Sequence, residues 1–434
     1  MEGQVCSMAA ALITKCPIHS GGANCQQGTL SLRVVRLWHC RPGGKPDRSD
    51  ECIGWQRLQI WQASGTPLPV ALASGLELKQ IPALDGLRAI AAFLVVLYHG
   101  GIAVSPGGLG VLAFFVIRGF LITWLLLDEQ ERHGGVSLRL FYVRRTLRIF
   151  PAFYVYWVLV VALSAIRHRV VWPQAIASLF YVNNYYQGLF GDPNTGLSHS
   201  WSLGVEEQFY LLWAPAFIWL QKTRRETVAK VLAVSIVTLW LYRLGLVWAG
   251  VHQGYIYEAF DTRADQLLLG CLLAFVLRIG AVQSLWNWLC SSIGYSVLIF
   301  AVLLFSVFLE NHFGSIYRDT VGFTLDALAV ALLIPLFICF RSNVAWGWLN
   351  WQPIRYLGRI SYSLYLYQQI TPDIVRKVVP HAAGVFFVVM NSIVVIIAAS
   401  FSYHFIERPF LRLKDRFIRK PERSESKPPV SAAL

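Results

Sequence analysis

Arg88 and His99 stand in one apolar segment, LDGLRAIAAFLVVLYHGG, and are its candidates for chemistry. Eleven residues of an α-helix make about three full turns, so both side chains lie on one face, about 16 Å apart along the axis. An arginine at the centre of a membrane helix costs about 2.5–3.5 kcal/mol on insertion scales, and such residues usually face the interior of a bundle. The pair therefore predicts a functional site inside a helical bundle.

A purely structural role for this pair is the alternative. In that case Asp85 caps the helix and pairs with Arg88 three residues on, and His99 satisfies a nearby carbonyl group. The arginine would then extend to the lipid headgroups. The sequence leaves both interpretations open.

A second group of polar residues opens the segment HSWSLGVEEQFY, which begins at His199. Ser200 or Ser202 is suited to cap this helix, which places Glu206 and Glu207 in its first turns, where the helix dipole favours negative charge. The functional alternative is that one glutamate faces the bundle interior and orients a base or a sugar hydroxyl. Adjacent helix residues point about 100° apart, so the two glutamates are not expected to share a partner.

Three arginines, Arg144, Arg145 and Arg148, precede another long apolar segment. Guanidinium groups match phosphate oxygens in geometry, so these residues are candidates for binding a phosphorylated cofactor at the cytoplasmic surface. Basic residues that only anchor the chain on that side of the membrane are the alternative.

Two further motifs place charge at or within apolar segments. Asp261, Arg263 and Asp265 open one segment, and Asp261 is suited to the N-cap position. Arg118 stands well inside another segment without an acidic residue nearby in the sequence. It must therefore find a partner across the bundle, either Glu206 or Asp265.

The composition is that of a membrane protein. Of 434 residues, 56% are hydrophobic and only 14% are charged, whereas a soluble domain has about 25% charged residues. The net charge of +14 comes from basic residues in short connections rather than on one face, which excludes a nucleic-acid-binding surface. We expect an all-α, polytopic membrane bundle of about ten transmembrane helices.

The apolar segments and the basic connections together predict a topology. Lysine and arginine concentrate in alternate connections, at 128–148, 221–228 and 341–357, and in the tail after 406. The positive-inside rule then places both termini in the cytoplasm, and the stretch at about 172–182 is expected to be re-entrant or interfacial. The expected spans lie at about 86–104, 109–127, 149–166, 201–220, 229–249, 264–280, 293–309, 321–340, 358–377 and 385–405.

The two ends of the chain differ from its apolar middle. Residues 1–78 hold five of the eight cysteines without a zinc-ligand spacing, and they lack the pattern of a signal peptide. We expect them to be disordered, or to be an extension from a wrongly assigned start. Residues 79–415 are expected to form the membrane domain, and residues 416–434 a disordered basic cytoplasmic tail. The sequence predicts no metal site.

Several short motifs occur in a fixed order along the chain. They are LDGLR at 84–88 with His99, GFLIT at 119–123, RRTLR at 144–148, HSWS at 199–202, EQFY at 207–210, RAD at 263–265, LGRISYSLYL at 357–366 and ERPF at 407–410. Through these motifs the chain resembles the membrane acyltransferase-3 family, integral-membrane O-acyltransferases that modify surface polysaccharides and other acceptors. The resemblance covers about residues 79–415, and it is specific in the number and order of the motifs.

The resemblance implies an acyl-CoA donor from the cytoplasm, usually acetyl-CoA, and no permanently bound cofactor. It implies Arg88 and His99 as the leading catalytic pair. His99 would act as general base or as a transient acyl carrier, and Arg88 would orient the thioester or stabilise the oxyanion. We expect a multi-pass protein of the bacterial cytoplasmic membrane, surrounded by lipids, whose oligomeric state the sequence leaves open.

The other candidate residues divide between the two substrates. Glu206 and Glu207 are further catalytic candidates beside the leading pair. Binding of the acyl-CoA donor is expected from Arg144, Arg145 and Arg148. Binding of a carbohydrate or other hydroxyl acceptor is expected from His199, Arg263, Asp265 and Arg118.

The chain departs from the family pattern at two motifs. The family often has Asp and Ser in GVDLFFVLSG, where this chain has Leu112 and Arg118, and often has Trp-His where this chain has Tyr367 and Gln368. A catalytically inactive relative is therefore one alternative. A transporter or flippase, with intramembrane Arg, His and Glu along a substrate path, is another. Inverted repeats would favour the transporter, and the sequence shows no convincing one.

Overall fold

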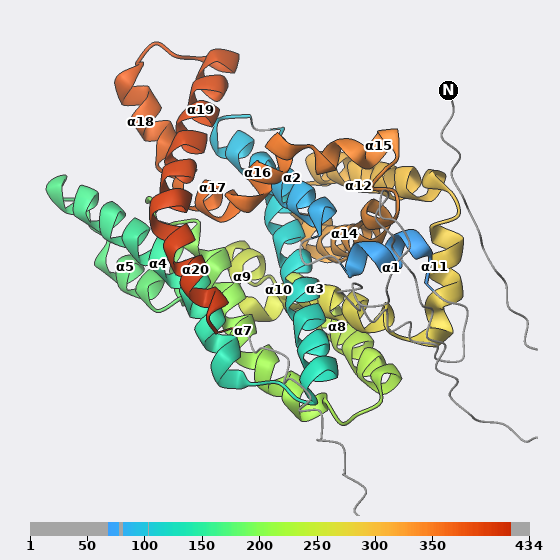
Figure 1. Cartoon of the computed structure of the whole chain (residues 1–434). Helices are drawn as coiled ribbons and strands as arrows, with labels where there is room; N and C mark the ends of the chain where they lie inside the picture. Colours follow the sequence, from blue (N-terminus) through green and yellow to red (C-terminus); the bar gives the residue numbers. More distant parts are fainter. Residues whose placement is uncertain (1–67, 78–80, 103, 418–434) are drawn as a thin grey trace, which may run out of the picture. The chain divides into compact units, whose positions relative to one another are not determined.

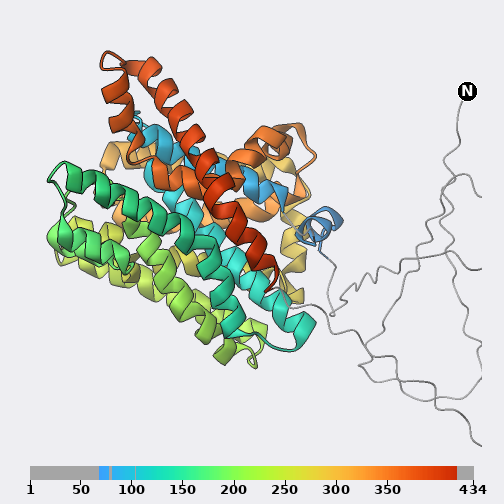
Figure 2. The same cartoon turned by 60° about the vertical axis from the view of Figure 1, so that its left-hand side comes forward.

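The computed structural model describes residues 68–77, 81–102 and 104–417, and these residues form helices without a strand (Figure 1). Figure 2 shows several long helices running side by side. The long helices are α2 (Pro82–His99), α3 (Gly107–His133), α4 (Leu138–Ile166), α7 (Ser200–Leu220), α8 (Arg225–Trp248), α10 (Phe260–Val276), α12 (Ile293–Phe313), α14 (Phe323–Cys339) and α19 (Gly384–Ser402).

Short helices connect the long ones. Among them, α5 has eight residues, too few to span a bilayer, and Trp172 and Ile176 are exposed, as expected of an interfacial helix. The short helices are α1 (Val70–Leu76), α5 (Trp172–Leu179), α6 (Asn183–Phe190), α9 (Gln253–Glu258), α11 (Gln283–Leu289), α13 (Ser315–Tyr317), α15 (Val344–Gly347), α16 (Gln352–Arg359), α17 (Ser361–Tyr367), α18 (Thr371–Val378) and α20 (Arg408–Asp415). Two π-helical turns, η2 (Arg318–Gly322) and η4 (Tyr403–Glu407), continue into α14 and α20.

The prediction of an all-α membrane bundle is confirmed, although the described residues contain fewer candidate spans than the ten expected. In the described part of the chain, seven helices are long and apolar enough to cross a membrane. A pair bent by 94°, Gln253–Val276 with Gly280–Leu289, makes eight if it is one span. The seven are Pro82–His99, Gly107–His133, Leu138–Ile166, Arg225–Trp248, Ile293–Phe313, Ser315–Cys339 and Gly384–Leu413.

The expected span at 358–377 is wrong. That stretch is divided among the end of α16, the whole of α17 and most of α18. Pro372 stands at the start of α18, where its missing N–H and its fixed φ favour a new helix over the continuation of the previous one. The segment around α17 therefore contributes a short buried helix to the interior of the bundle.

The expected side-chain caps are also wrong. Ile81, His199 and Ala259 occupy the N-cap positions of α2, α7 and α10, and none of them makes a side-chain cap hydrogen bond. The polar residues that were expected to cap these helices instead lie inside the helices and form ion pairs or hydrogen bonds with other side chains. They are Asp85, Ser200, Ser202 and Asp261.

Order at the N-terminal side begins before the expected domain boundary at residue 79. Helix α1 belongs to the extension expected to be disordered, yet Leu72 is fully buried in the core and Gly75 lies against Ile338 of α14. Most of residues 1–78 and of the expected tail at 416–434 lie outside the described residues. Most of the buried apolar side chains of the described part form one continuous cluster, from Leu72 to Ala399.

Helices α3 and α10 touch through their backbones. A Cβ atom added to Gly119 would lie 1.9 Å from the Leu267 carbonyl oxygen, and one added to Gly270 would lie 2.1 Å from the Val116 carbonyl oxygen. Small residues allow such close approach between membrane helices. This contact fixes the position of Arg118, which precedes Gly119 on α3.

We therefore expect Gly119→Ala to lower the free energy of unfolding by about 1–3 kcal/mol or more, because the new methyl group meets backbone that cannot move aside. Thermal unfolding of the purified protein in one detergent measures this loss. Gly245→Ala is the matched control, since a Cβ at Gly245 of α8 meets nothing within 4 Å. Equal unfolding temperatures for the two variants would contradict the close contact.

Candidate active site

Arg118 makes an ion pair near the centre of the bundle. Its Nη1 atom lies 3.1 Å from Glu206 Oε2 on α7 and donates a 3.0 Å hydrogen bond to the Tyr210 hydroxyl. The side chains of Arg118 and Glu206 are 13% and 6% exposed, and charges buried to this degree need such partners. The prediction of a partner across the bundle is confirmed, and that partner is Glu206 rather than Asp265.

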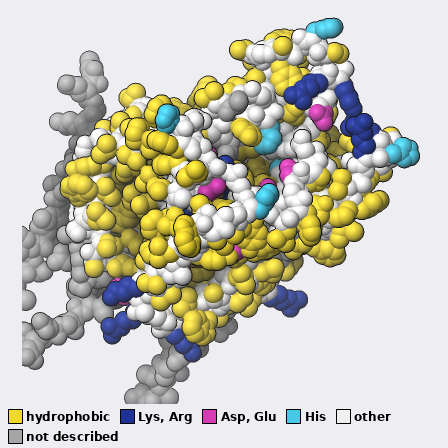
Figure 3. Space-filling view, turned by 180° about the vertical axis from the view of Figure 1, so that it is seen from behind, with side chains coloured by type: hydrophobic (Ala, Val, Ile, Leu, Met, Phe, Trp, Pro, Cys, Tyr) yellow, Lys and Arg dark blue, Asp and Glu magenta, His cyan; other side chains and the backbone are white. Residues whose placement is uncertain are grey.

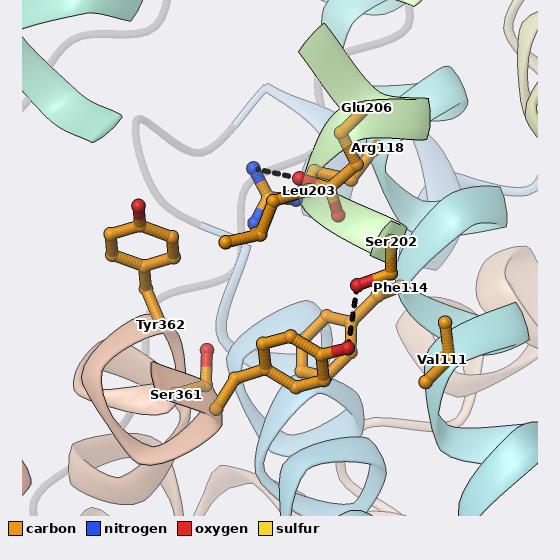
Figure 4. A pocket seen from close by; sticks show the side chains of 9 residues that line it. Val111, Phe114, Arg118, Ser202, Leu203, Glu206, Ser361 and Tyr362 are labelled. Carbon is orange, nitrogen blue, oxygen red and sulfur yellow. Dashed lines mark hydrogen bonds and ion pairs between the residues drawn. The ribbon is translucent and has the colours of Figure 1, made fainter. Parts of the chain in front are cut away.

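A narrow cleft opens beside this ion pair (Figure 4). Ser202 of α7 and Tyr365 of α17 share a 2.5 Å hydrogen bond there, and the Tyr365 hydroxyl also lies 3.2 Å from the His199 carbonyl oxygen. Polar groups from three motifs thus meet in one space. The cleft is lined by Val111, Phe114, Arg118, Ser202, Leu203, Glu206, Ser361, Tyr362 and Tyr365.

Arg88 and Arg148 extend the positive charge of Arg118. Both lie within electrostatic range of Arg118 and of Glu407. Arg88 reaches Asp85 only at 3.9 Å, which matches the structural alternative but exceeds hydrogen-bond distance. In the described part of the chain Arg148 makes no ion pair within 4.0 Å. The protein therefore leaves donors of both guanidinium groups available to an anion.

The three arginines of the RRTLR motif do not act as one group. Arg144 pairs with Glu129 at 2.6 Å, near the end of α3. Arg145 lies over the rings of Phe141 and Tyr210, at 5.6 and 5.9 Å from their centroids. Arg148 lies within electrostatic range of Arg88 and Arg118. The structure thus brings Arg145 and Arg148 toward the cleft and engages Arg144 elsewhere.

His99 is the last residue of α2 and is partly buried. Its Nδ1 atom lies 3.0 Å from the Val95 carbonyl oxygen. Because a carbonyl oxygen can only accept, Nδ1 carries the proton and Nε2 keeps its lone pair. The hydrogen bond from Nδ1 to a nearby carbonyl is the one expected of a structural histidine. It nevertheless leaves Nε2 available to act as base or nucleophile.

His199 lies near His99, just before α7. The residue is 4% exposed, and its ring packs between Tyr156 and Tyr365, at centroid distances of 5.3 and 5.5 Å. Neither ring nitrogen has a hydrogen-bond partner among the described residues. Burial and, to a smaller extent, a charge on His99 lower the pKa of His199 to about 3, so His199 is neutral at physiological pH.

Glu206 and Glu207 have different surroundings, as their adjacent positions on the helix predict. Glu206 pairs with Arg118, whereas the Oε1 atom of Glu207 is buried without a hydrogen-bond partner in the described part of the chain. Glu207 lies in electrostatic range of Tyr154 and Tyr181. Of the two, only Glu206 lines the cleft.

The RAD motif is divided between two environments. Asp265 accepts a 2.9 Å hydrogen bond from Arg243 in a fully buried ion pair, and it also binds Thr324. Arg263 is in electrostatic range of both members of that pair, but its guanidinium lies among aromatic rings. Asp265 therefore has an ion-pair partner, and Arg263 makes no hydrogen bond or ion pair with the described residues.

Sequence reasoning missed two charged residues of the interior. Glu407 accepts a hydrogen bond from Ser363 and lies in electrostatic range of Arg88 and Arg148. The ERPF motif at 407–410 was the feature of the sequence that could have pointed to Glu407. Arg243 was detectable as a lone arginine in the apolar stretch TLWLYRLGLVW.

Comparison with known proteins gives matches along most of the chain. The acyltransferase domain model matches residues 81–404. The chain is 34% identical over 359 residues to the putative peptidoglycan O-acetyltransferase YrhL of Bacillus subtilis, covering 76% of this chain and 55% of that one. It is 33% identical over 366 residues to the peptidoglycan O-acetyltransferase OatA of Listeria monocytogenes, covering 76% and 56%.

A putative O-acetyltransferase of Staphylococcus aureus is 32% identical over 354 residues, covering 77% of this chain and 58% of the relative. The chain thus matches a little over half the length of these relatives. No solved structure matches it.

Proposed function

The chain belongs to the acyltransferase family whose domain its residues 81–404 match, and from this membership we propose that it is a membrane O-acyltransferase. The donor is acetyl-CoA and the acceptor a hydroxyl group of a cell-wall glycan, as the names of the relatives support. One observation carries the proposal. Helix α2 holds Arg88, beside Arg148 and Arg118, and also His99, whose Nε2 is free.

The acyl-CoA donor binds at the arginine cluster. Arg88, Arg145 and Arg148 face the interior with donors that the protein does not fully use, and guanidinium groups suit phosphate oxygens. Acetyl-CoA is a substrate here and not a resident cofactor. Because Arg144 is held by Glu129, we assign it a lesser part in binding the donor than its sequence motif predicts.

Arg88 binds the donor rather than stabilising the oxyanion. It lies about 16 Å from His99 along the helix axis, and helix side chains tilt toward the N-terminus, which takes the Arg88 guanidinium further away. One carbonyl carbon cannot contact both residues. The extended arm of CoA instead carries the thioester from the arginine cluster toward His99.

His99 performs the proton transfer. Its Nε2 accepts the proton of the acceptor hydroxyl as that oxygen forms a bond to the thioester carbonyl carbon. The carbon–sulfur bond then breaks, and the proton passes to the departing thiolate, which gives free CoA and an O-acetyl ester. In the two-step form Nε2 attacks the thioester carbonyl carbon and displaces CoA as the thiolate. The acceptor oxygen then displaces Nε2 from the acetyl group, and the hydroxyl proton passes to the thiolate.

The acceptor approaches from the side on which α2 ends. Neutral His199, with two unpartnered nitrogens, and Glu206, held by Arg118, are the nearby groups suited to orient a hydroxyl. The alternating basic connections support cytoplasmic termini and residence in the bacterial inner membrane. In that topology α2 begins at the cytoplasmic face and His99 lies toward the outer face.

The deciding experiment uses the full-length protein in lipid nanodiscs with acetyl-CoA and a soluble disaccharide fragment of peptidoglycan. Release of free CoA thiol and formation of an acetylated disaccharide, detected by mass spectrometry, are both expected. Release of neither product would contradict the proposal and favour a transporter or an inactive relative. Thiol release without acetylated sugar would contradict the acceptor class.

The donor site gives a separate prediction. Arg148→Ala should raise the KM for acetyl-CoA about tenfold or more while kcat changes less, because phosphate contacts are made equally in the ground and transition states. Steady-state kinetics with saturating disaccharide measures both constants. Arg132→Ala, which removes an exposed arginine paired with Asp128, is the control. An unchanged KM for acetyl-CoA would mean that Arg148 only anchors the helix.

A further inference from the structure

Arg263 is a fully buried cation without a hydrogen-bond partner. Its side chain has no exposed surface, and all three guanidinium nitrogens lack a partner among the described residues. Four aromatic rings surround it instead. Their centroids lie 3.8 Å (Phe323), 5.1 Å (Tyr257), 5.7 Å (Phe115) and 5.7 Å (Trp201) from the guanidinium carbon. Cation–π contacts offset part of the burial cost, but the N–H donors stay unused.

A carboxylate with an unused oxygen lies nearby. Glu258, the last residue of α9, is partly buried, and its Oε2 atom has no hydrogen-bond partner in the described part of the chain. It is in electrostatic range of Arg263 but not within the 4.0 Å of an ion pair. A guanidinium and a carboxyl group that lie close without touching leave hydrogen-bond donors on one side and a carboxyl oxygen on the other.

This pair lies beside the catalytic end of α2. Tyr257, which forms one wall around Arg263, precedes Glu258 and packs against α3, where its hydroxyl would lie 3.1 Å from a Cβ atom at Gly108. Tyr257 is also in electrostatic range of Tyr98, whose ring makes an edge contact with the His99 ring. Figure 3 shows that acidic and histidine side chains gather around a hollow on one face of the molecule.

We propose that Arg263 and Glu258 form the subsite that binds the sugar ring of the acceptor. A sugar hydroxyl donates and accepts at once, so it satisfies Glu258 Oε2 on one side and the Arg263 N–H groups on the other. The aromatic walls pack against the apolar C–H surface of the ring. This inference rests on the proposed function and names the part of the acceptor that the site holds.

Charges of both signs surround the pair. Glu258 is in electrostatic range of Asp192, and Glu310 is in range of Arg263. Arg263 is also in range of Asp265 and of two further cations, Arg243 and Arg318. The hydrogen-bonding groups rather than the net charge therefore set the ligand class, which is a hydroxyl-bearing pyranose ring.

The test measures binding and turnover separately. Equilibrium dialysis of a radiolabelled N-acetylated disaccharide fragment of peptidoglycan, with the full-length protein in nanodiscs, gives the Kd. Kinetics with the same disaccharide gives KM for acceptor and donor. Glu258→Gln should raise the Kd and the acceptor KM about threefold to tenfold, as expected for one lost hydrogen bond, and leave the donor KM within about twofold. Arg263→Lys, which keeps the charge but not the planar fork, should act in the same direction.

Asp326→Asn is the matched control. Asp326 of α14 is a buried carboxylate with an unpartnered oxygen, like that of Glu258, but its charged neighbour is Glu310. It should leave the disaccharide Kd unchanged. If Glu258→Gln binds the disaccharide as tightly as wild type, the subsite is wrong even when acetyl transfer proceeds. If wild type binds the disaccharide through Glu258 but never acetylates it, the subsite stands and the proposed function fails.

Discussion

We expect His99→Ala to abolish acetyl transfer while the bundle stays folded. The free Nε2 of His99 is the group that takes the hydroxyl proton, and a general base contributes about 10²–10⁴-fold to the rate, with a larger loss if the imidazole carries the acetyl group. The hydrogen bond that the variant loses is a local one, from Nδ1 to Val95 of the same helix. Its removal should therefore cost little stability.

The measurement is turnover of purified, monodisperse His99→Ala protein with saturating acetyl-CoA and disaccharide. His312→Ala is the matched control, because it removes an exposed histidine at the end of α12. Activity of the His99 variant within about threefold of wild type, far less than a base supplies, would overturn the assignment. His199 and Glu206 would then be the remaining candidates. Aggregation of the variant would identify a structural histidine.

The second large effect concerns stability. Arg118→Met should lower the free energy of unfolding by about 3–5 kcal/mol, because it leaves the Glu206 carboxylate buried without its partner. It also removes the hydrogen-bond donor to the Tyr210 hydroxyl. The double variant Arg118→Met/Glu206→Gln should recover most of this loss, since it contains no unpaired charge.

Thermal unfolding of the two single variants and the double variant in one detergent gives the coupling energy. A double variant less stable than Arg118→Met would show that the two side chains are not coupled. Arg132→Met, which breaks an exposed pair with Asp128, should change stability by less than about 1 kcal/mol.

The sequence was sufficient to predict the helical bundle and the need for a partner at Arg118. Both follow from the cost of placing polar groups in an apolar environment, which is a property of residue type. It could not decide between Glu206 and Asp265 as that partner. Arg243 on another helix takes Asp265, and which helices become neighbours is set by packing that no local pattern encodes.

Other failures also came from tertiary contacts. The stretch at 358–377 was expected to span the membrane, but its residues form short helices that pack in the interior, where Tyr362 donates to the Ile149 carbonyl oxygen. The RAD motif was treated as one unit, yet Arg263 and Asp265 are two residues apart on α10, point about 200° apart and face different partners. The prediction that Ser200 or Ser202 caps α7 was wrong because their hydroxyl groups form hydrogen bonds with Ser178 and Tyr365 of other helices.

The backbone contact between α3 and α10 makes these two helices one rigid frame. Arg118 stands beside Gly119 on one side of the frame, and Arg263 stands two turns from Gly270 on the other, so the distance between the inner ion pair and the aromatic surroundings of Arg263 stays constant. We therefore expect the helices that move to admit substrate or release product to be those that contact α3 and α10 through side chains only, such as α17 and α19. In hydrogen exchange, the amides around Gly119 and Gly270 should be the last to exchange, and those of α17 should exchange earlier.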